Sequence, residues 1–333
     1  MKKHLKKNRF GDSASPNISA LRLVVDHLAL ISLLQIVLIL LLQLSSGLVD
    51  SLGSTISPNV EWVTPYIRRA WQMLLYFLTL YLPVCLATLI HKSWPLYASF
   101  CMKPALPAFT PLIVCASVGI LYAVGYVINL LLGAYMQESS PTLLCSHSAG
   151  GIIISFVATV ILPAFLEEIV YRGIFLQALL PYGKAFAVIT SGLLFGIMHL
   201  RFSQLFYATA AGILIGYFTV KGGSLWVGIF IHLANNLLSF ILGAVREICG
   251  TDSSISFFVE RWTGCAVFVL GAVSILILVH LHTRGAFQPL EPSAEYYDTP
   301  LALQTALKNF LTPLMTMYLV LSLYMIYANV FSA

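Results

Sequence analysis

The segment 151-GIIISFVATVILPAFLEEIVYRGIFLQALL-180 is apolar over a length sufficient to cross a membrane, yet it contains Glu167, Glu168 and Arg172. A spanning helix needs about 20 predominantly apolar residues. An ionisable side chain at bilayer depth costs roughly 2.5 kcal/mol or more, so such groups are rare there and usually pair or carry out a function. This segment therefore predicts a membrane-spanning helix and a functional site within it.

The composition of the whole chain extends this prediction to the fold. Hydrophobic residues make up 59% of the sequence, charged residues only 9%, and the mean hydropathy is +0.89. Soluble domains carry about 25% charged residues. Because open sheets cannot cross hydrocarbon and the segments lack the alternation of barrel strands, the spans must be helices. We predict an all-α polytopic transmembrane bundle of eight or nine spans, near residues 28–45, 70–91, 111–135, 150–180, 184–200, 203–220, 225–245, 262–281 and 310–331.

Basic residues predict the orientation of these spans. The N-terminal stretch 1-MKKHLKKNRF-10 is a cluster that the positive-inside rule places in the cytoplasm. With alternating spans, the cytoplasmic segments would hold Lys92, Lys103, Lys184, Lys221, Arg284 and Lys308, and the exterior would hold Arg68, Arg69, Arg201, Arg246 and Arg261. The net charge of +5 then reflects topology and contact with an anionic lipid bilayer. No nucleic-acid motif accompanies it, so we expect no nucleic-acid partner.

The first of three polar patches is 167-EEIVYR-172. Residues four apart on a helix share a face, so Glu168 and Arg172 are expected to form an ion pair. Glu167 points roughly 100° away around the helix and is left without that partner, which makes it a candidate general base. The alternative is that both glutamates belong to one structural ion cluster with Arg172.

The other two patches are 195-FGIMH-199 and 232-HLANN-236. Phe195 and His199 are four apart, so the aromatic ring can pack beside the imidazole and orient it. His232 shares a helix face with Asn235 and Asn236, an arrangement that could bind a developing oxyanion. Each patch alone could equally serve helix–helix packing through hydrogen bonds.

A register argument connects the first two patches. Pro181 and Gly183 are suitable turn residues, so the fourth and fifth predicted spans can form an antiparallel hairpin. This hairpin brings Glu167 and His199 to the same depth. The spacing of Gly212 and Gly216 also permits close helix packing within the bundle.

The patterns EExxxR, FxxxH and HxxxN, in this order in successive spans, resemble the motifs of the CAAX prenyl protease and bacteriocin-processing family, also called type II CAAX proteases. The resemblance implies an intramembrane endopeptidase in which Glu167 activates water and His199 assists. It implies that His232 and Asn236 stabilise the oxyanion. Supporting positions are Glu168, Arg172, Phe195 and Asn235.

The resemblance also suggests a division of the chain and a class of substrate. Residues 150–245 would form the catalytic core, between an N-terminal tail with accessory spans (1–149) and C-terminal accessory spans (246–333). Eukaryotic members of the family cut prenylated C-terminal tails, and bacterial members take part in bacteriocin maturation, self-immunity or peptide processing. Short loops and the absence of organelle signals favour a bacterial plasma membrane. We expect a membrane protein or peptide as substrate, and the oligomeric state stays open.

Three alternatives remain at this point. Glu167, His199 and His232 could together bind zinc, as the label metalloprotease given to this family suggests, although a metal-free glutamate mechanism has also been argued for it. Glu–His chains also relay protons in transporters, although no inverted repeat with paired broken helices is visible in the sequence. A non-catalytic membrane scaffold is the third alternative.

Overall fold

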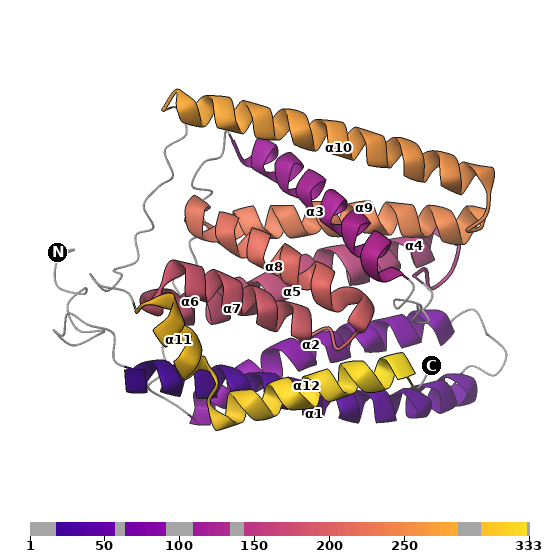
Figure 1. The fold of residues 1–333 in the computed structure, drawn as a ribbon. Helices are drawn as coiled ribbons and strands as arrows, with labels where there is room; N and C mark the ends of the chain where they lie inside the picture. Colours follow the sequence, from indigo (N-terminus) through magenta and orange to yellow (C-terminus); the bar gives the residue numbers. More distant parts are fainter. Residues whose placement is uncertain (1–17, 57–63, 91–108, 134–142, 286–300, 332–333) are drawn as a thin grey trace, which may run out of the picture.

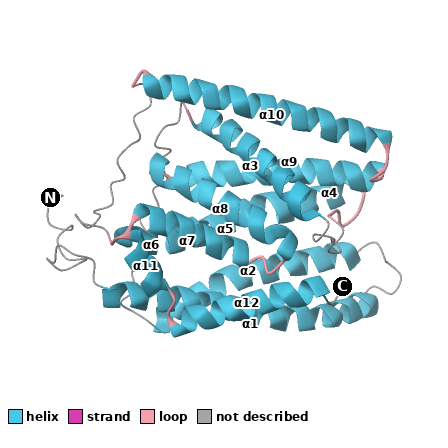
Figure 2. Ribbon diagram, in the orientation of Figure 1, coloured by secondary structure: helices cyan, strands magenta, loops and turns pink. Residues whose placement is uncertain are grey.

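The computed structural model describes residues 18–56, 64–90, 109–133, 143–285 and 301–331 (Figure 1). The basic N-terminal cluster, Lys92 and Lys103 lie outside these ranges. Every regular element within them is a helix, as the colouring of Figure 2 shows. The prediction of an all-α polytopic bundle is confirmed.

Eight helices in the described ranges are long and apolar enough to span a membrane. They are α1 (Ile18–Ile56), α2 (Thr64–Ile90), α3 (Thr110–Leu132), the continuous run from α4 (Ala149–Phe156) to η5 (Leu180–Tyr182), α8 (Phe202–Gly222), α9 (Leu225–Cys249), α10 (Ser254–Thr283) and α12 (Pro313–Phe331). The first begins at Ile18, ten residues before the predicted start near residue 28.

The fifth predicted span, 184–200, is not among these eight helices and corresponds to α7 (Lys184–Ile197), which has only 14 residues. At 1.5 Å per residue this helix is about 21 Å long, short of the roughly 30 Å hydrocarbon core. The turn between α7 and α8 ends short of the outer ends of α9 and α10 (Figure 1). Arg201 lies in this turn, and its place on the exterior stays a prediction.

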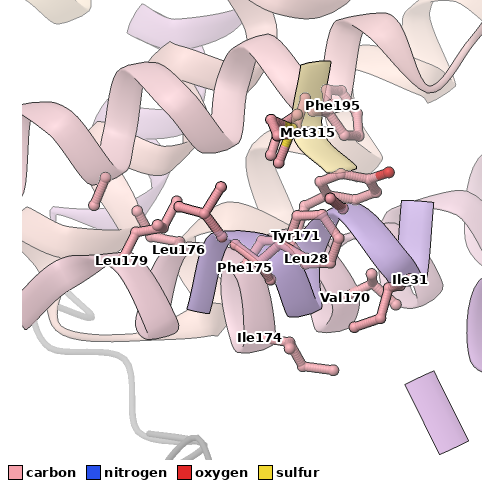
Figure 3. Packing of buried hydrophobic residues seen from close by; sticks show 14 of the residues in the cluster. Leu28, Ile31, Val170, Tyr171, Ile174, Phe175, Leu176, Leu179, Phe195 and Met315 are labelled. Atoms are coloured by element: carbon pink, nitrogen blue, oxygen red, sulfur yellow. The ribbon is translucent and has the colours of Figure 1, made fainter. Parts of the chain in front are cut away.

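The helices form three layers (Figure 1). The long run 149–182, α7, α8 and α9 make the central layer. Helices α3 and α10 cover the side formed by α8 and α9, while α1, α2, α12 and the short α11 (Leu303–Phe310) cover the other side. The largest apolar cluster lies between the central layer and α1 and α12, where Tyr171 and Phe175 pack against Leu28, Ile31 and Met315 (Figure 3).

The hairpin predicted at 181-PYGK-184 is present. A short 3₁₀ turn, η5, ends at Gly183, whose φ of +140° is a conformation that L side chains rarely adopt. Helix α7 then starts at Lys184 and runs back along the central layer. It packs closely on α8, because Gly192 and Gly212 let the two backbones meet.

This crossing gives a prediction for two glycines of α8. A Cβ on Gly212 would lie 2.8 Å from the Cα of Gly192, whereas a Cβ on Gly216 would lie 3.7 Å from its nearest neighbour, a methyl carbon of Val188. Overpacking typically costs about 1–3 kcal/mol, and alanine gains up to about 1 kcal/mol of helix propensity over glycine. We expect Gly212→Ala to lower the thermal unfolding temperature in detergent and Gly216→Ala to leave it equal or higher. Equal unfolding temperatures for the two variants would contradict the predicted crossing.

Candidate active site

The carboxylate of Glu168 is the centre of a buried polar cluster. Its Oε1 accepts a hydrogen bond from Nη1 of Arg172 at 2.8 Å and another from Nδ1 of His232 at 2.7 Å. Glu168 is 0% exposed, Arg172 1% and His232 6%. The predicted pair of Glu168 and Arg172 is therefore present, and His232 of α9 is its third member. Because charge-assisted bonds are strong and specific in direction, this carboxylate fixes both partners.

Arg172 is held by two further contacts. Its Nη2 donates to the carbonyl oxygen of Gly212 at 3.1 Å, and its guanidinium carbon lies 4.4 Å from the ring centre of Phe195. Phe195 lies on α7 and Gly212 on α8, so the close approach of these two helices places both groups beside Arg172. A guanidinium over an aromatic face is attracted by the ring quadrupole. The site therefore depends on the central layer as a whole.

Glu167, the neighbouring carboxylate, has different partners. Its Oε1 accepts a hydrogen bond from the hydroxyl of Tyr76 on α2, and its Oε2 lies 3.7 Å from Nε2 of His232. Glu167 is 5% exposed. At 3.7 Å the second contact is longer than a hydrogen bond. One oxygen of Glu167 is thus fixed by a donor, and the other faces the imidazole with its lone pairs available.

The charges of this cluster constrain its chemistry. Two carboxylates and one guanidinium leave one negative charge in surroundings where uncompensated charge is expensive. One further proton makes the cluster neutral, and His232 contacts both carboxylates. With Nδ1–H donating to Glu168, a proton on Nε2 would point toward Oε2 of Glu167. This arrangement places a base and a donor side by side.

Phe195 links His199 to the cluster. Its ring centre lies 5.1 Å from that of His199 and 5.9 Å from that of His232, with edge-to-face geometry in both cases. His199 follows the end of α7, and its Nδ1–H donates to the carbonyl of Phe195 at 2.9 Å. In neutral His199 the other ring nitrogen, Nε2, is then the acceptor.

The turn after His199 is held by the last helix of the chain. Leu200 has a positive φ of 53°, which costs a side-chain-bearing residue about 1–2 kcal/mol. Its carbonyl oxygen accepts a hydrogen bond of 2.9 Å from Nδ2 of Asn329 on α12. Helix α12 therefore contributes to the position of His199 although it follows the motifs by almost a hundred residues.

The imidazole beside Glu167 is that of His232 and not, as the hairpin had led us to expect, that of His199. Within the described residues, Glu167 contacts His232 and has no hydrogen bond or ion pair with His199. There are two physical reasons. The long helix contains wider π-helical turns at η3 (Val157–Ile161) and η4 (Ile169–Leu176), on either side of α5 (Leu162–Glu168), and these change the direction of its side chains. In addition, α7 ends at Ile197, so His199 lies in a turn and not on the extrapolated helix.

Asn236 contacts the backbone of the long helix. Pro163 has no N–H, so the carbonyl of Thr159 lacks its normal donor four residues along. Nδ2 of Asn236 donates to this carbonyl at 3.3 Å and replaces part of the lost bonding. Asn235, the neighbouring amide, accepts a hydrogen bond of 2.5 Å from the hydroxyl of Tyr207 on α8. Asn236, the last residue of the HxxxN motif, thus links α9 to the long helix that carries both glutamates.

The zinc ligands suggested by the sequence do not come together as a metal site. Among the described residues, no group of three or more His, Cys, Asp and Glu side chains is arranged to hold a metal ion. In His232, Nδ1 is engaged by Glu168, which leaves Nε2 near Glu167 as its one free position. Oε2 of Glu167 and Nε2 of His232 thus lie side by side, but His199 is not grouped with them as a third donor.

Sequence reasoning missed three residues of this region: Tyr76, Tyr207 and Asn329. All three lie on helices whose sequences carry no motif. An isolated tyrosine or asparagine in an apolar span gives only a weak signal, that of a polar group that needs a buried partner.

Comparison with known proteins gives one match. Residues 149–238 match a protein-family model described as type II CAAX prenyl endopeptidase Rce1-like. No curated protein and no solved structure matches the chain. The matched segment contains all three motifs and covers the long helix, α7, α8 and the first half of α9.

The shared carboxylate predicts the stability of two variants. Arg172→Ala leaves Glu168 buried without its main counter-charge, and breaking a buried pair in this way costs about 3–5 kcal/mol. Replacing both members, Glu168→Gln with Arg172→Gln, removes both charges together. We expect the double variant to unfold at a higher temperature in detergent than Arg172→Ala. A double variant that is no more stable than the single variant would contradict the pairing.

Proposed function

We propose that this chain, which belongs to the Rce1-like family through residues 149–238, is an intramembrane endopeptidase. Its substrate is a membrane-associated protein or peptide, and its reaction is hydrolysis of a peptide bond by water that Glu167 activates. The observation that carries the proposal is the asymmetry of the two glutamates. Oε1 of Glu168 binds both Arg172 and His232, and its Oε2 is buried without a hydrogen-bond partner, whereas Oε2 of Glu167 lies beside Nε2 of His232.

The proposed reaction begins with proton transfer. Water donates a proton to Oε2 of Glu167, and its oxygen attacks the carbonyl carbon of the substrate. The carbonyl oxygen becomes an oxyanion, which Nε2–H of His232 stabilises from its position beside Glu167. The C–N bond then breaks, and the proton held by Glu167 passes to the leaving nitrogen. The products are a carboxylic acid and an amine, and transfer of a proton between them gives a carboxylate and an ammonium group.

Two other motif residues support these steps in the proposal. Asn236 uses one amide hydrogen for Thr159, and its second can donate to the oxyanion. His199, oriented by its bond to the Phe195 carbonyl, relays protons to or from the substrate. Zinc is not required in this scheme, because the side chains of this cluster supply both the base and the oxyanion donor.

We further propose that the N-terminus faces the cytoplasm of a bacterial cell. Support comes from one end of the bundle, where α1, α7 and α9 begin and α8 and α10 end (Figure 1). Basic residues gather there on five elements: Arg22, Lys184, Lys221, Arg284 and Lys308. The opposite end carries Arg68, Arg69, Arg246 and Arg261, of which Arg246 is paired with Glu260, so the proposal rests mainly on the basic N-terminal cluster.

The test of the proposed function is cleavage by the full-length protein in proteoliposomes. Two fluorogenic peptides serve as probes, one ending in a farnesylated CAAX sequence and one with the same sequence unmodified. We expect wild type to cleave at least one, and Glu167→Gln to lose activity by about 10²–10⁴-fold. Glu260→Gln, which removes a carboxylate outside the site, is the control and should cleave like wild type.

Two results would contradict the proposed function. One is a folded wild-type protein that cleaves neither probe, and uptake of a peptide without cleavage would then favour a transporter. The other is a Glu167→Gln variant that cleaves as fast as wild type. The ratio of the rates on the two peptides also shows whether a prenyl group is required.

The metal question has its own test. Because His199 is not grouped with Glu167 and His232 as a third donor, we expect purified protein to cleave peptide with far less than one equivalent of bound metal and to keep its activity after treatment with a membrane-permeant chelator. Metal content is measured by mass spectrometry for wild type, His199→Ala and His232→Ala. Stoichiometric zinc that both substitutions remove, together with activity that zinc restores, would contradict the metal-free scheme.

A further inference from the structure

Helix α2 lies outside the segment that matches the family, yet it reaches the candidate active site. It contacts α1 on one side and α4 and α5 on the other. Residues 76, 80 and 84 recur at helical spacing on one face of α2, and Leu80 and Val84 are buried. Tyr76 is the member of this face that stands beside Glu167, and its hydroxyl donates to Oε1 of that carboxylate.

The hydroxyl of Tyr76 limits the orientations that the Glu167 carboxylate can adopt. The last torsion of a glutamate side chain is broad and nearly two-fold, so a carboxylate without a fixed partner samples many orientations. Glu168 has Arg172 and His232 to fix it, but neither makes a hydrogen bond to Glu167. Tyr76 supplies a donor to one oxygen of Glu167, and the other oxygen is thereby directed at Nε2 of His232.

We propose that Tyr76 is a positioning residue of the active site, and that its hydroxyl holds the Glu167 carboxylate with Oε2 facing His232 and the reacting water. The catalytic part of this proposal rests on the proposed function, whereas the contact between Tyr76 and Glu167 does not. It follows that the catalytic centre extends beyond the family-matched residues and includes a helix from the N-terminal third of the chain.

The first test is kinetic and uses Tyr76→Phe, which removes the hydroxyl and keeps the ring. The matched control is Tyr81→Phe, the same change five residues along α2, where the ring stacks on Phe77. With the two fluorogenic peptides in proteoliposomes, we expect Tyr76→Phe to lower kcat by roughly 10- to 100-fold, the range typical of a lost orienting contact. KM should stay within about twofold, and Tyr81→Phe should change neither constant by more than that.

A merely structural role for Tyr76 would change kcat and KM together with stability. The proposal would be overturned by a kcat for Tyr76→Phe equal to that of Tyr81→Phe. It would also be overturned if Tyr76→Phe lowered the residual rate of Glu167→Gln as strongly as that of wild type, because the hydroxyl acts through that carboxylate.

The second test does not need activity. Thermal unfolding in detergent is measured for wild type, Tyr76→Phe, Glu167→Gln and the double variant. Residues in contact show non-additive effects, so we expect the double variant to differ from the sum of the single variants, while Tyr81→Phe with Glu167→Gln should be additive. Additive behaviour for Tyr76 and Glu167 would overturn the contact. If wild type cleaves neither peptide, the proposed function and the catalytic role of Tyr76 both fail, and this cycle still decides the contact.

Discussion

The hydrogen bonds that Oε1 of Glu168 accepts from Arg172 and His232 are the interaction on which the rest of this site depends. A buried carboxylate without partners would be destabilising by several kcal/mol, so the fold must place these two donors beside Glu168. Arg172 comes from the same helix, four residues along, and is fixed from the other side by the Gly212 carbonyl and the Phe195 ring. His232 comes from α9. Because Arg172 and His232 both donate to Glu168, Glu167 takes its hydrogen bond from Tyr76 instead, and the different roles proposed for the two adjacent glutamates follow from this difference in partners.

The accessory helices belong to this arrangement. Residues 149–238 match the family, but two contacts that hold the site come from outside them: the hydroxyl of Tyr76 on α2 reaches Glu167, and the amide of Asn329 on α12 holds the turn after His199. Helix α1 packs against both α2 and α12, and all three contribute residues to the largest apolar cluster, so this layer fixes the positions of both helices. A helix of 14 residues such as α7 is too short to cross a bilayer. The position of its C-terminal end therefore depends on contacts with these neighbouring helices.

The sequence predicted those features that depend on local periodicity and composition. The helical bundle follows from apolar length, the pair of Glu168 and Arg172 from spacing on one helix, and the turn at Gly183 from its residue types. Predictions that relied on how helices lie against one another were less secure. His199 was expected opposite Glu167, but π-helical turns around Pro163 and the early end of α7 place His232 there. Tyr76 could not be found from sequence, because its partner is 91 residues away and no local pattern marks it.

The most direct test of the central claim is the protonation of His232, measured by ¹⁵N NMR on histidine-labelled protein in lipid bilayers. The resonances of His232 are identified by their loss in His232→Gln. If Glu168 is shared as described, Nδ1 of His232 carries a proton, and its signal moves when Glu168 is replaced by Gln. An unprotonated Nδ1, or a His232 signal that is unchanged in Glu168→Gln, would contradict the account.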